Sequence, residues 1–365
     1  MVLGSVPIRS ATISTVLTLC WCVCVNTSGA VCKPILLSRH DIYSDYYNEV
    51  SDEEQEQPAY PQNAALNDAN CGVDGRSAIT KRVLNGSSAD DHLFPWAVKL
   101  YRVDERGKLG LCTGSLISDR HVLTAAHCVY GKDYVGGIIV LMGSANPHLR
   151  SHQTVKRTVE AIRMHGGYIH EGLVRDIALL ILSEPVRYGP TLRPVCLPYP
   201  WMGDYAWETA IVAGHGVAGY KKSGKTQKPK FPQVLQYVDL RVQSDYRCSI
   251  QWARYGEFNP EYQICAKRGY HGPCGGDSGG PLMHRSPSTY KMYVIGITSY
   301  VKGRSSTKCL TKYGGVFVRV SAYYGWILKG LEKSEGWVTT RCEDHQHEHD
   351  SCELYYKILK LLEMY

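Results

Sequence analysis

The sequence predicts an all-β fold, and three observations support this prediction. Between residues 96 and 320 the apolar residues come in short continuous or alternating runs, as in buried and half-buried strands. Clusters of Gly, Pro, Asn and Lys separate these runs and are typical of turns. The chain has 365 residues, 44% of them apolar, and 14 cysteines. It is therefore long enough for one large domain with appended segments, and its cysteine content indicates an oxidising compartment.

Five runs predict strands most clearly, and one later segment predicts a helix. Each run is short, apolar or alternating, and bounded by turn residues. The last segment, Ser321 to Leu331, has a helical pattern that would close the domain. The predicted strands are Trp96 to Val103, Ile138 to Met142, Ala210 to Ala213, Tyr293 to Tyr300 and Gly315 to Val320.

Residues 1–30 are predicted to be a secretory signal peptide. Arg9 precedes an apolar core at about Val16 to Val25, and the small residues Ser28-Gly29-Ala30 suit a cleavage site. A signal anchor is the alternative, but the polar residues from Asn26 to Ser28 make this run a weak membrane span. We therefore expect a secreted, extracellular protein with no stable membrane span.

Residues 31–82 are predicted to be an acidic pro-segment without a folded module. Nine acidic residues and no Lys or Arg lie between Asp41 and Asp74, and aliphatic residues are few. Such a composition cannot bury enough surface to fold alone. The acidic segment is expected either to stay solvated or to lie on the basic remainder of the chain.

Three short tracts contain the residues of an activated nucleophile. They are Thr124-Ala125-Ala126-His127-Cys128, Asp176-Ile177-Ala178-Leu179-Leu180 and Gly276-Asp277-Ser278-Gly279-Gly280-Pro281. Because a serine hydroxyl must lose its proton as it attacks a carbonyl, His127 is assigned as base, Asp176 as the group that orients it, and Ser278 as nucleophile. The N–H groups of Gly276 and Ser278 would form an oxyanion hole. Each tract alone has an ordinary structural explanation, but their order His, Asp, Ser is a known triad order.

With these tracts, the chain resembles a secreted serine protease of the chymotrypsin/trypsin family over about residues 83–334. The motifs TAAHC, DIALL and GDSGGP, the Gly86 start signal and the cysteine pattern carry the resemblance. It implies two packed six-stranded antiparallel β-barrels with a C-terminal helix, and a triad in the cleft between the barrels. The expected activity is that of a serine endopeptidase (a hydrolase acting on protein or peptide substrates), with no cofactor and no metal.

The resemblance also implies four disulfides and leaves three mature cysteines unassigned. Ala210 and His284 stand where many relatives carry a further disulfide. Cys32, Cys342 and Cys352 remain, and the sequence does not decide which thiol is free or bonded to another molecule. The implied pairs are Cys112 with Cys128, Cys248 with Cys265, Cys274 with Cys309, and Cys71 with Cys196.

The resemblance further implies a zymogen activated by cleavage after Arg82 by another protease. The new α-amino group of Val83 would insert and pair with Asp277, and before cleavage the oxyanion hole would not be formed. Because Cys71 and Cys196 are expected to be bonded, the pro-segment would stay tethered after cleavage.

The residues matching the family's specificity pocket carry no charge. Gly272 stands at the base of the pocket, where a carboxylate would select Lys or Arg, and Val301 and Gly315 match its walls. A Lys or Arg side chain of a substrate would be buried there without a partner. We therefore expect cleavage after uncharged residues of small to medium apolar type.

Two further segments have two explanations each. Lys221, Lys222, Lys225, Lys228 and Lys230 crowd one loop, which is either a solvated loop or a surface for an inhibitor or anionic partner. No nucleic acid is implied, because no aromatic stacking set accompanies the charge. The extension 335–365 contains a His-rich run and an apolar pattern at helical spacing. It is expected to be a hydrated tail, with weak metal binding as the alternative.

A different class of function remains as the alternative: a catalytically silent, protease-like binding protein or cascade cofactor. Such proteins usually lack a triad residue, and this chain has all three.

Overall fold

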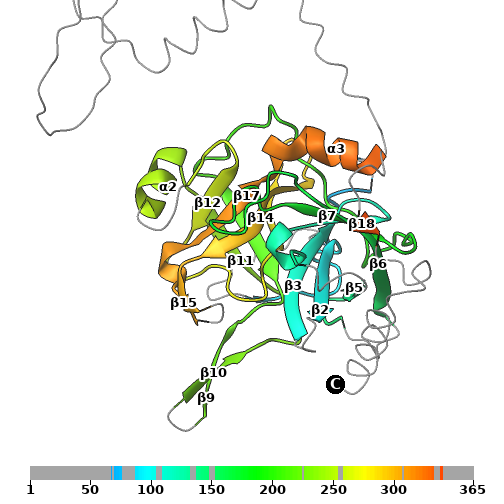
Figure 1. Cartoon of the computed structure of the whole chain (residues 1–365), viewed down its shortest axis with the longest axis horizontal. Helices are drawn as coiled ribbons and strands as arrows, with labels where there is room; N and C mark the ends of the chain where they lie inside the picture. Colours follow the sequence, from blue (N-terminus) through cyan, green and yellow to red (C-terminus); the bar gives the residue numbers. More distant parts are fainter. Residues whose placement is uncertain are drawn as a thin grey trace, which may run out of the picture. The chain divides into compact units, whose positions relative to one another are not determined.

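A computed structural model describes residues 67, 70–75, 87–103, 109–131, 137–147, 153–223, 226–253, 258–305, 308–332 and 338–339. The strands form two antiparallel barrels that lie side by side (Figure 1). The predicted signal peptide, most of the pro-segment and the C-terminal extension except residues 338–339 lie outside the described residues. So do Arg82, Val83 and the three unassigned cysteines.

The first barrel comprises six strands and closes because β6 pairs with both β5 and β7. The short strand β18 (Val338–Thr339) adds to β6 at the edge. The strands of this barrel are β2 (Ala97–Val103), β3 (Leu109–Leu116), β4 (His121–Thr124), β5 (Ile138–Met142), β6 (Val155–Met164) and β7 (Ala178–Leu182).

The second barrel also comprises six strands and closes because β8 pairs with both β11 and β13. The short strand β1 (Ser87–Ser88) adds to β11. The strands of this barrel are β8 (Thr209–Gly214), β11 (Gln236–Val242), β12 (Gln263–Lys267), β13 (Pro281–Arg285), β14 (Met292–Val301) and β17 (Gly315–Arg319).

These barrels confirm the predicted fold class. The predicted helix is present, but it begins as the 3₁₀ turn η4 (Val320–Tyr323) and continues as α3 (Tyr324–Glu332), which buries Ile327 and Leu328. The helix α2 (Asp245–Trp252) was not predicted. Its sequence signal is Ser244, whose side chain caps the helix by accepting a hydrogen bond from the N–H of Arg247.

A continuous apolar core joins the two barrels. Trp96 is fully buried, and its Nε1–H donates to Met283 Sδ at 2.9 Å, which links β2's N-terminal end to β13. Leu100 of the first barrel and Val294 of the second belong to the same buried cluster. This shared core fixes the barrels against each other and thereby positions loops that come from both.

Four disulfides are present, and they are the pairs that the resemblance implies: Cys71–Cys196, Cys112–Cys128, Cys248–Cys265 and Cys274–Cys309. The segment 70–75 is held further by an ion pair between Asp74 and Arg285. At the positions without a disulfide, His284 Nδ1 lies 3.2 Å from the carbonyl oxygen of Thr209, next to Ala210. A hydrogen bond thus joins β13 to β8 where many relatives have a covalent link.

The lysine-rich segment forms a hairpin where the sequence suggested a loop. Strands β9 (Gly219–Ser223) and β10 (Thr226–Lys230) pair with each other and extend away from the second barrel (Figure 1). A second small ribbon joins β15 (Gly303–Ser305) to β16 (Lys308–Cys309), followed by the 3₁₀ turn η3 (Thr311–Tyr313). Within the described residues, no helix has the length and apolar character needed to cross a membrane.

Candidate active site

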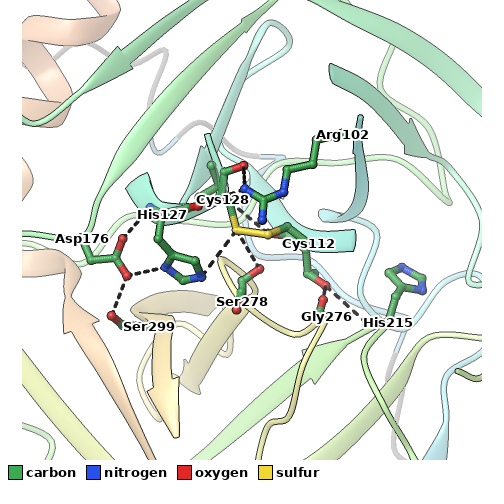
Figure 2. Close-up of a disulfide and its surroundings, with 11 residues drawn as sticks. Arg102, Cys112, His127, Cys128, Asp176, His215, Gly276, Ser278 and Ser299 are labelled. Carbon is green, nitrogen blue, oxygen red and sulfur yellow. Dashed lines mark hydrogen bonds and ion pairs between the residues drawn. A yellow bond between two sulfur atoms is a disulfide. The ribbon is translucent and has the colours of Figure 1, made fainter. Parts of the chain in front are cut away.

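His127 lies in a 3₁₀ turn that three links fix to the first barrel. The turn η1 (Ala126–Cys128) follows β4, and the Cys112–Cys128 disulfide ties it to β3. The guanidinium of Arg102 donates to the carbonyl oxygens of His127 and Cys128, at 3.1 and 2.9 Å (Figure 2). The backbone that carries the imidazole is therefore held from both sides.

Asp176 is fully buried and accepts three hydrogen bonds. Its Oδ1 accepts from the backbone N–H of His127 at 2.8 Å, and its Oδ2 lies 2.7 Å from the Nδ1 of the same residue. The hydroxyl of Ser299 donates to Oδ2 at 2.6 Å. Because the carboxylate accepts, the Nδ1 of His127 carries the proton, and Nε2 is left as the basic nitrogen.

Ser278 comes from the second barrel and lies on the Nε2 side of the His127 ring (Figure 2). Its carbonyl oxygen accepts from the backbone N–H of Thr113 at 2.8 Å, across the barrel interface. No hydrogen bond between the described residues joins His127 Nε2 to the Ser278 hydroxyl. Such bonds are often long in unliganded enzymes and tighten when substrate binds.

Gly276, whose N–H is predicted to form part of the oxyanion hole, has a backbone conformation that favours glycine. Its φ is +98°, a value that disfavours any residue with a side chain, and the backbone of Gly216 lies close to it. The Thr113 hydroxyl donates to the carbonyl oxygen of Gly276 at 3.0 Å, which fixes this peptide against the first barrel.

Asp277 lines a cavity of about 290 Å³. The cavity is lined in part by Gly214, Gly216, Val217 and Tyr220. The Asp277 carboxylate accepts hydrogen bonds from the backbone N–H of Gly216 at 2.7 Å and from the backbone N–H of Cys274 at 2.9 Å. Burial of the carboxyl outweighs these two bonds and raises the pKa of Asp277 to about 6. Of the described residues, none forms an ion pair with this carboxylate.

The residues of the predicted specificity pocket converge at one end of the second barrel. Val301 of β14 pairs with Gly315 of β17. A side chain at Gly315 would meet the ring of Pro273, and Gly272 lies beside Gly314. Asp277 is the one acidic residue in the three segments that surround the pocket, 267–277, 299–305 and 309–316. Two lysines of these segments, Lys302 and Lys312, place their ammonium groups over the Tyr313 ring.

A cluster of potential metal ligands is found at one place in the described residues: Cys112, His127 and Cys128. The two sulfurs are bonded to each other in a disulfide, so neither is a thiolate. The arrangement therefore does not fit a metal ion.

Three residues that support this site were not predicted from the sequence. Ser299, Arg102 and Thr113 bind Asp176, the His127 turn and the Gly276 peptide respectively. Ser299 lies next to the pocket residue Val301, but nothing in its sequence context indicates a bond to a carboxylate far away in the chain.

The chain is similar to known proteins over this region. A family profile described as Trypsin matches residues 83–327. The chain is 30% identical to the clotting factor G beta subunit of Tachypleus tridentatus over 273 residues, which is 72% of this chain and 82% of that protein. It is 33% identical to phenoloxidase-activating factor 3 of Holotrichia diomphalia over 269 residues, 68% of this chain and 72% of that protein. It is 28% identical to the proclotting enzyme of Tachypleus tridentatus, covering 72% of this chain and 68% of that protein.

Proposed function

Because this chain belongs to the trypsin family of serine proteases, we propose that it is a secreted serine endopeptidase made as a zymogen and activated by cleavage after Arg82. The observation that carries the proposal is the His127–Asp176 pair, with Nδ1 and Oδ2 2.7 Å apart and Ser278 on the other side of the ring (Figure 2).

The reaction divides into two transfers of an acyl group. The Ser278 oxygen attacks the carbonyl carbon of the substrate while His127 Nε2 takes the hydroxyl proton, and the N–H groups of Gly276 and Ser278 bind the oxyanion. The C–N bond then breaks, and the imidazolium returns its proton to the leaving amine. Water, deprotonated by the same nitrogen, then attacks the ester; the C–O bond to Ser278 breaks, the imidazolium returns its proton to the Ser278 oxygen, and the acid is released.

Asp176 and Ser299 act through His127 in this scheme. The buried carboxylate keeps the ring in the Nδ1–H tautomer and stabilises the imidazolium that forms during the reaction. The hydrogen bond from Ser299 holds the carboxylate oxygen that faces the ring.

Activation is proposed to use the cavity at Asp277. Cleavage after Arg82 would free the ammonium group of Val83. This cation would form an ion pair with the Asp277 carboxylate, which accepts hydrogen bonds from two backbone N–H groups. A buried ion pair of this kind is stable only when both charges are matched. Asp277 directly precedes Ser278, so the pair would also hold the Gly276–Ser278 peptides in place.

The specificity proposed is for uncharged residues of small to medium apolar type. Asp277 is the one acidic residue of the pocket segments, and its charge would be matched by the Val83 ammonium after activation, so no carboxylate is left for a cationic substrate side chain; the two lysines near Tyr313 disfavour such a side chain as well. The bulk of Val301 opposite Gly315 would narrow the pocket.

Secretion is supported by the four disulfides, which persist in oxidising compartments. The partners proposed are protein or peptide substrates and an activating protease.

The test is a peptide-library digest by the protein cut after Arg82, with Ser278→Ala as the matched control. We expect hydrolysis after Ala, Val or Leu that the control lacks. Faster cleavage after Arg and Lys would overturn the specificity. Equal, background digestion by both proteins would favour the silent binding protein.

A further inference from the structure

The β9–β10 hairpin gathers lysines on one of its faces. The strand register places Lys221 directly opposite Lys228, and Lys230 follows two residues along β10. Residues directly opposite in an antiparallel ladder, and residues two apart in a strand, share a face. The three side chains are exposed, so their ammonium groups form one basic strip, called here the lysine face.

The lysine face has no internal counter-charge among the described residues. Like charges directly opposite each other destabilise a two-stranded ladder. The segment 219–230 contains no Asp or Glu. The ion pairs of the described residues involve other cations. A bound polyanion would therefore relieve repulsion that the hairpin itself does not offset.

The register also indicates what kind of polyanion fits. The described side-chain positions on the lysine face are Gly219, Lys221, Lys228 and Lys230, none of them apolar. An acidic protein segment would find no apolar anchor there, and such anchors carry most of the binding energy in protein interfaces. A sulfated polysaccharide, as a polyanion, needs regularly spaced cations. The lysines supply these at about 5 Å across the ladder and about 7 Å along it.

We infer that the lysine face of the β9–β10 hairpin binds a sulfated polysaccharide. The hairpin is closed at its base by the N–H of Ala218, which donates to the carbonyl oxygen of Lys230 at 3.1 Å. The adjoining residues Val217 and Tyr220 line the cavity at Asp277. The polymer would thus bind beside the segment proposed for activation, but binding itself does not require catalysis.

The test measures heparin binding by the full chain carrying Ser278→Ala, which removes self-digestion. The hairpin variant is Lys221→Gln, Lys228→Gln and Lys230→Gln. A charge-matched control replaces the exposed residues Arg187, Lys312 and Lys329 with Gln. We expect the hairpin variant to lose about tenfold or more in affinity at low salt. For this variant the slope of log K against log salt should become less steep by about 2 to 3, because about one counterion fewer is released on binding for each lysine contact that is lost.

Two further measurements keep the result interpretable. Replacing the same three lysines with Arg retains the charge and should retain most of the affinity, and unfolding curves will show whether each variant is folded. Equal losses in the hairpin and control variants would overturn the inference. The inference would also be overturned if polyglutamate or single-stranded DNA displaced the protein from heparin at lower concentrations than soluble heparin does.

Discussion

Asp176 and Asp277 are two enclosed carboxylates with different partners. Asp176 accepts hydrogen bonds from the ring and backbone of His127 and from Ser299, all within the folded domain. Among the described residues, Asp277 accepts from the N–H groups of Gly216 and Cys274, and burial raises its pKa to about 6. The hydrogen bonds of the first site come from within the folded domain, whereas no cation among the described residues pairs with the second. This difference is what a switch operated by a newly formed amino terminus requires.

The largest expected effect comes from removing the charge of Asp176. Asp176→Asn in the activated protein should lower kcat by about 10⁴, because the amide favours the wrong tautomer of His127. Steady-state hydrolysis of the best library peptide measures this. Ser299→Ala removes one of three hydrogen bonds and should cost only about tenfold. Equal losses in the two variants would contradict the assigned roles.

The second effect concerns Asp277 after activation. Asp277→Asn should lower kcat/KM of the cut protein by about 10² to 10³, because breaking a buried ion pair typically costs about 3–5 kcal/mol. Asp245→Asn, which removes a half-exposed carboxylate paired with Arg319, is the matched control. A cut Asp277→Asn protein with full activity would show that no such pair forms.

The third effect is on the stability of the uncut protein. Because burial raises the pKa of Asp277 to about 6, the folded state binds more protons than the unfolded state between about pH 4 and 6. The contribution of this group to the unfolding free energy therefore falls by about 2–3 kcal/mol as pH rises through that window. Urea unfolding of the uncut Ser278→Ala protein, with and without Asp277→Asn, should show a loss of stability that the second variant lacks. The same pH slope in both would refute this assignment.

The smallest effect involves His215, a buried residue near Gly276 (Figure 2). Neither ring nitrogen has a hydrogen-bond partner in the described part of the chain, and burial together with the nearby Lys99 charge lowers the pKa of His215 to about 3. The unfolded state binds more protons between about pH 3 and 6.5, so this group lowers stability as pH falls through that window. The change in unfolding free energy caused by His215→Phe should therefore be more favourable at pH 5 than at pH 8 by about 2 kcal/mol.

Urea unfolding at the two pH values measures the His215 effect. His92→Phe, at an exposed site, controls for the loss of a titrating side chain. An identical pH dependence in His215→Phe and the unsubstituted protein would contradict the buried, neutral imidazole.

Local patterns predicted more of the fold than of the site. The run Ile138 to Met142 was predicted as a strand and is β5, because alternation and apolar content are properties of neighbouring residues. The bond from Ser299 to Asp176 spans 123 positions and depends on how the barrels pack. The lysine-rich hairpin was missed because its polar strands show no apolar alternation; its pairing is seen only in the register of β9 and β10.

The most direct test of this comparison is covalent labelling of Ser278 by a fluorophosphonate probe before and after cleavage at Arg82, followed by mass spectrometry. If Asp277 requires the Val83 amine while His127 and Asp176 are already paired, labelling should rise by about 10² or more on cleavage, and Asp277→Asn should abolish the rise. Labelling that never appears, or that is equally fast before cleavage, would contradict the account.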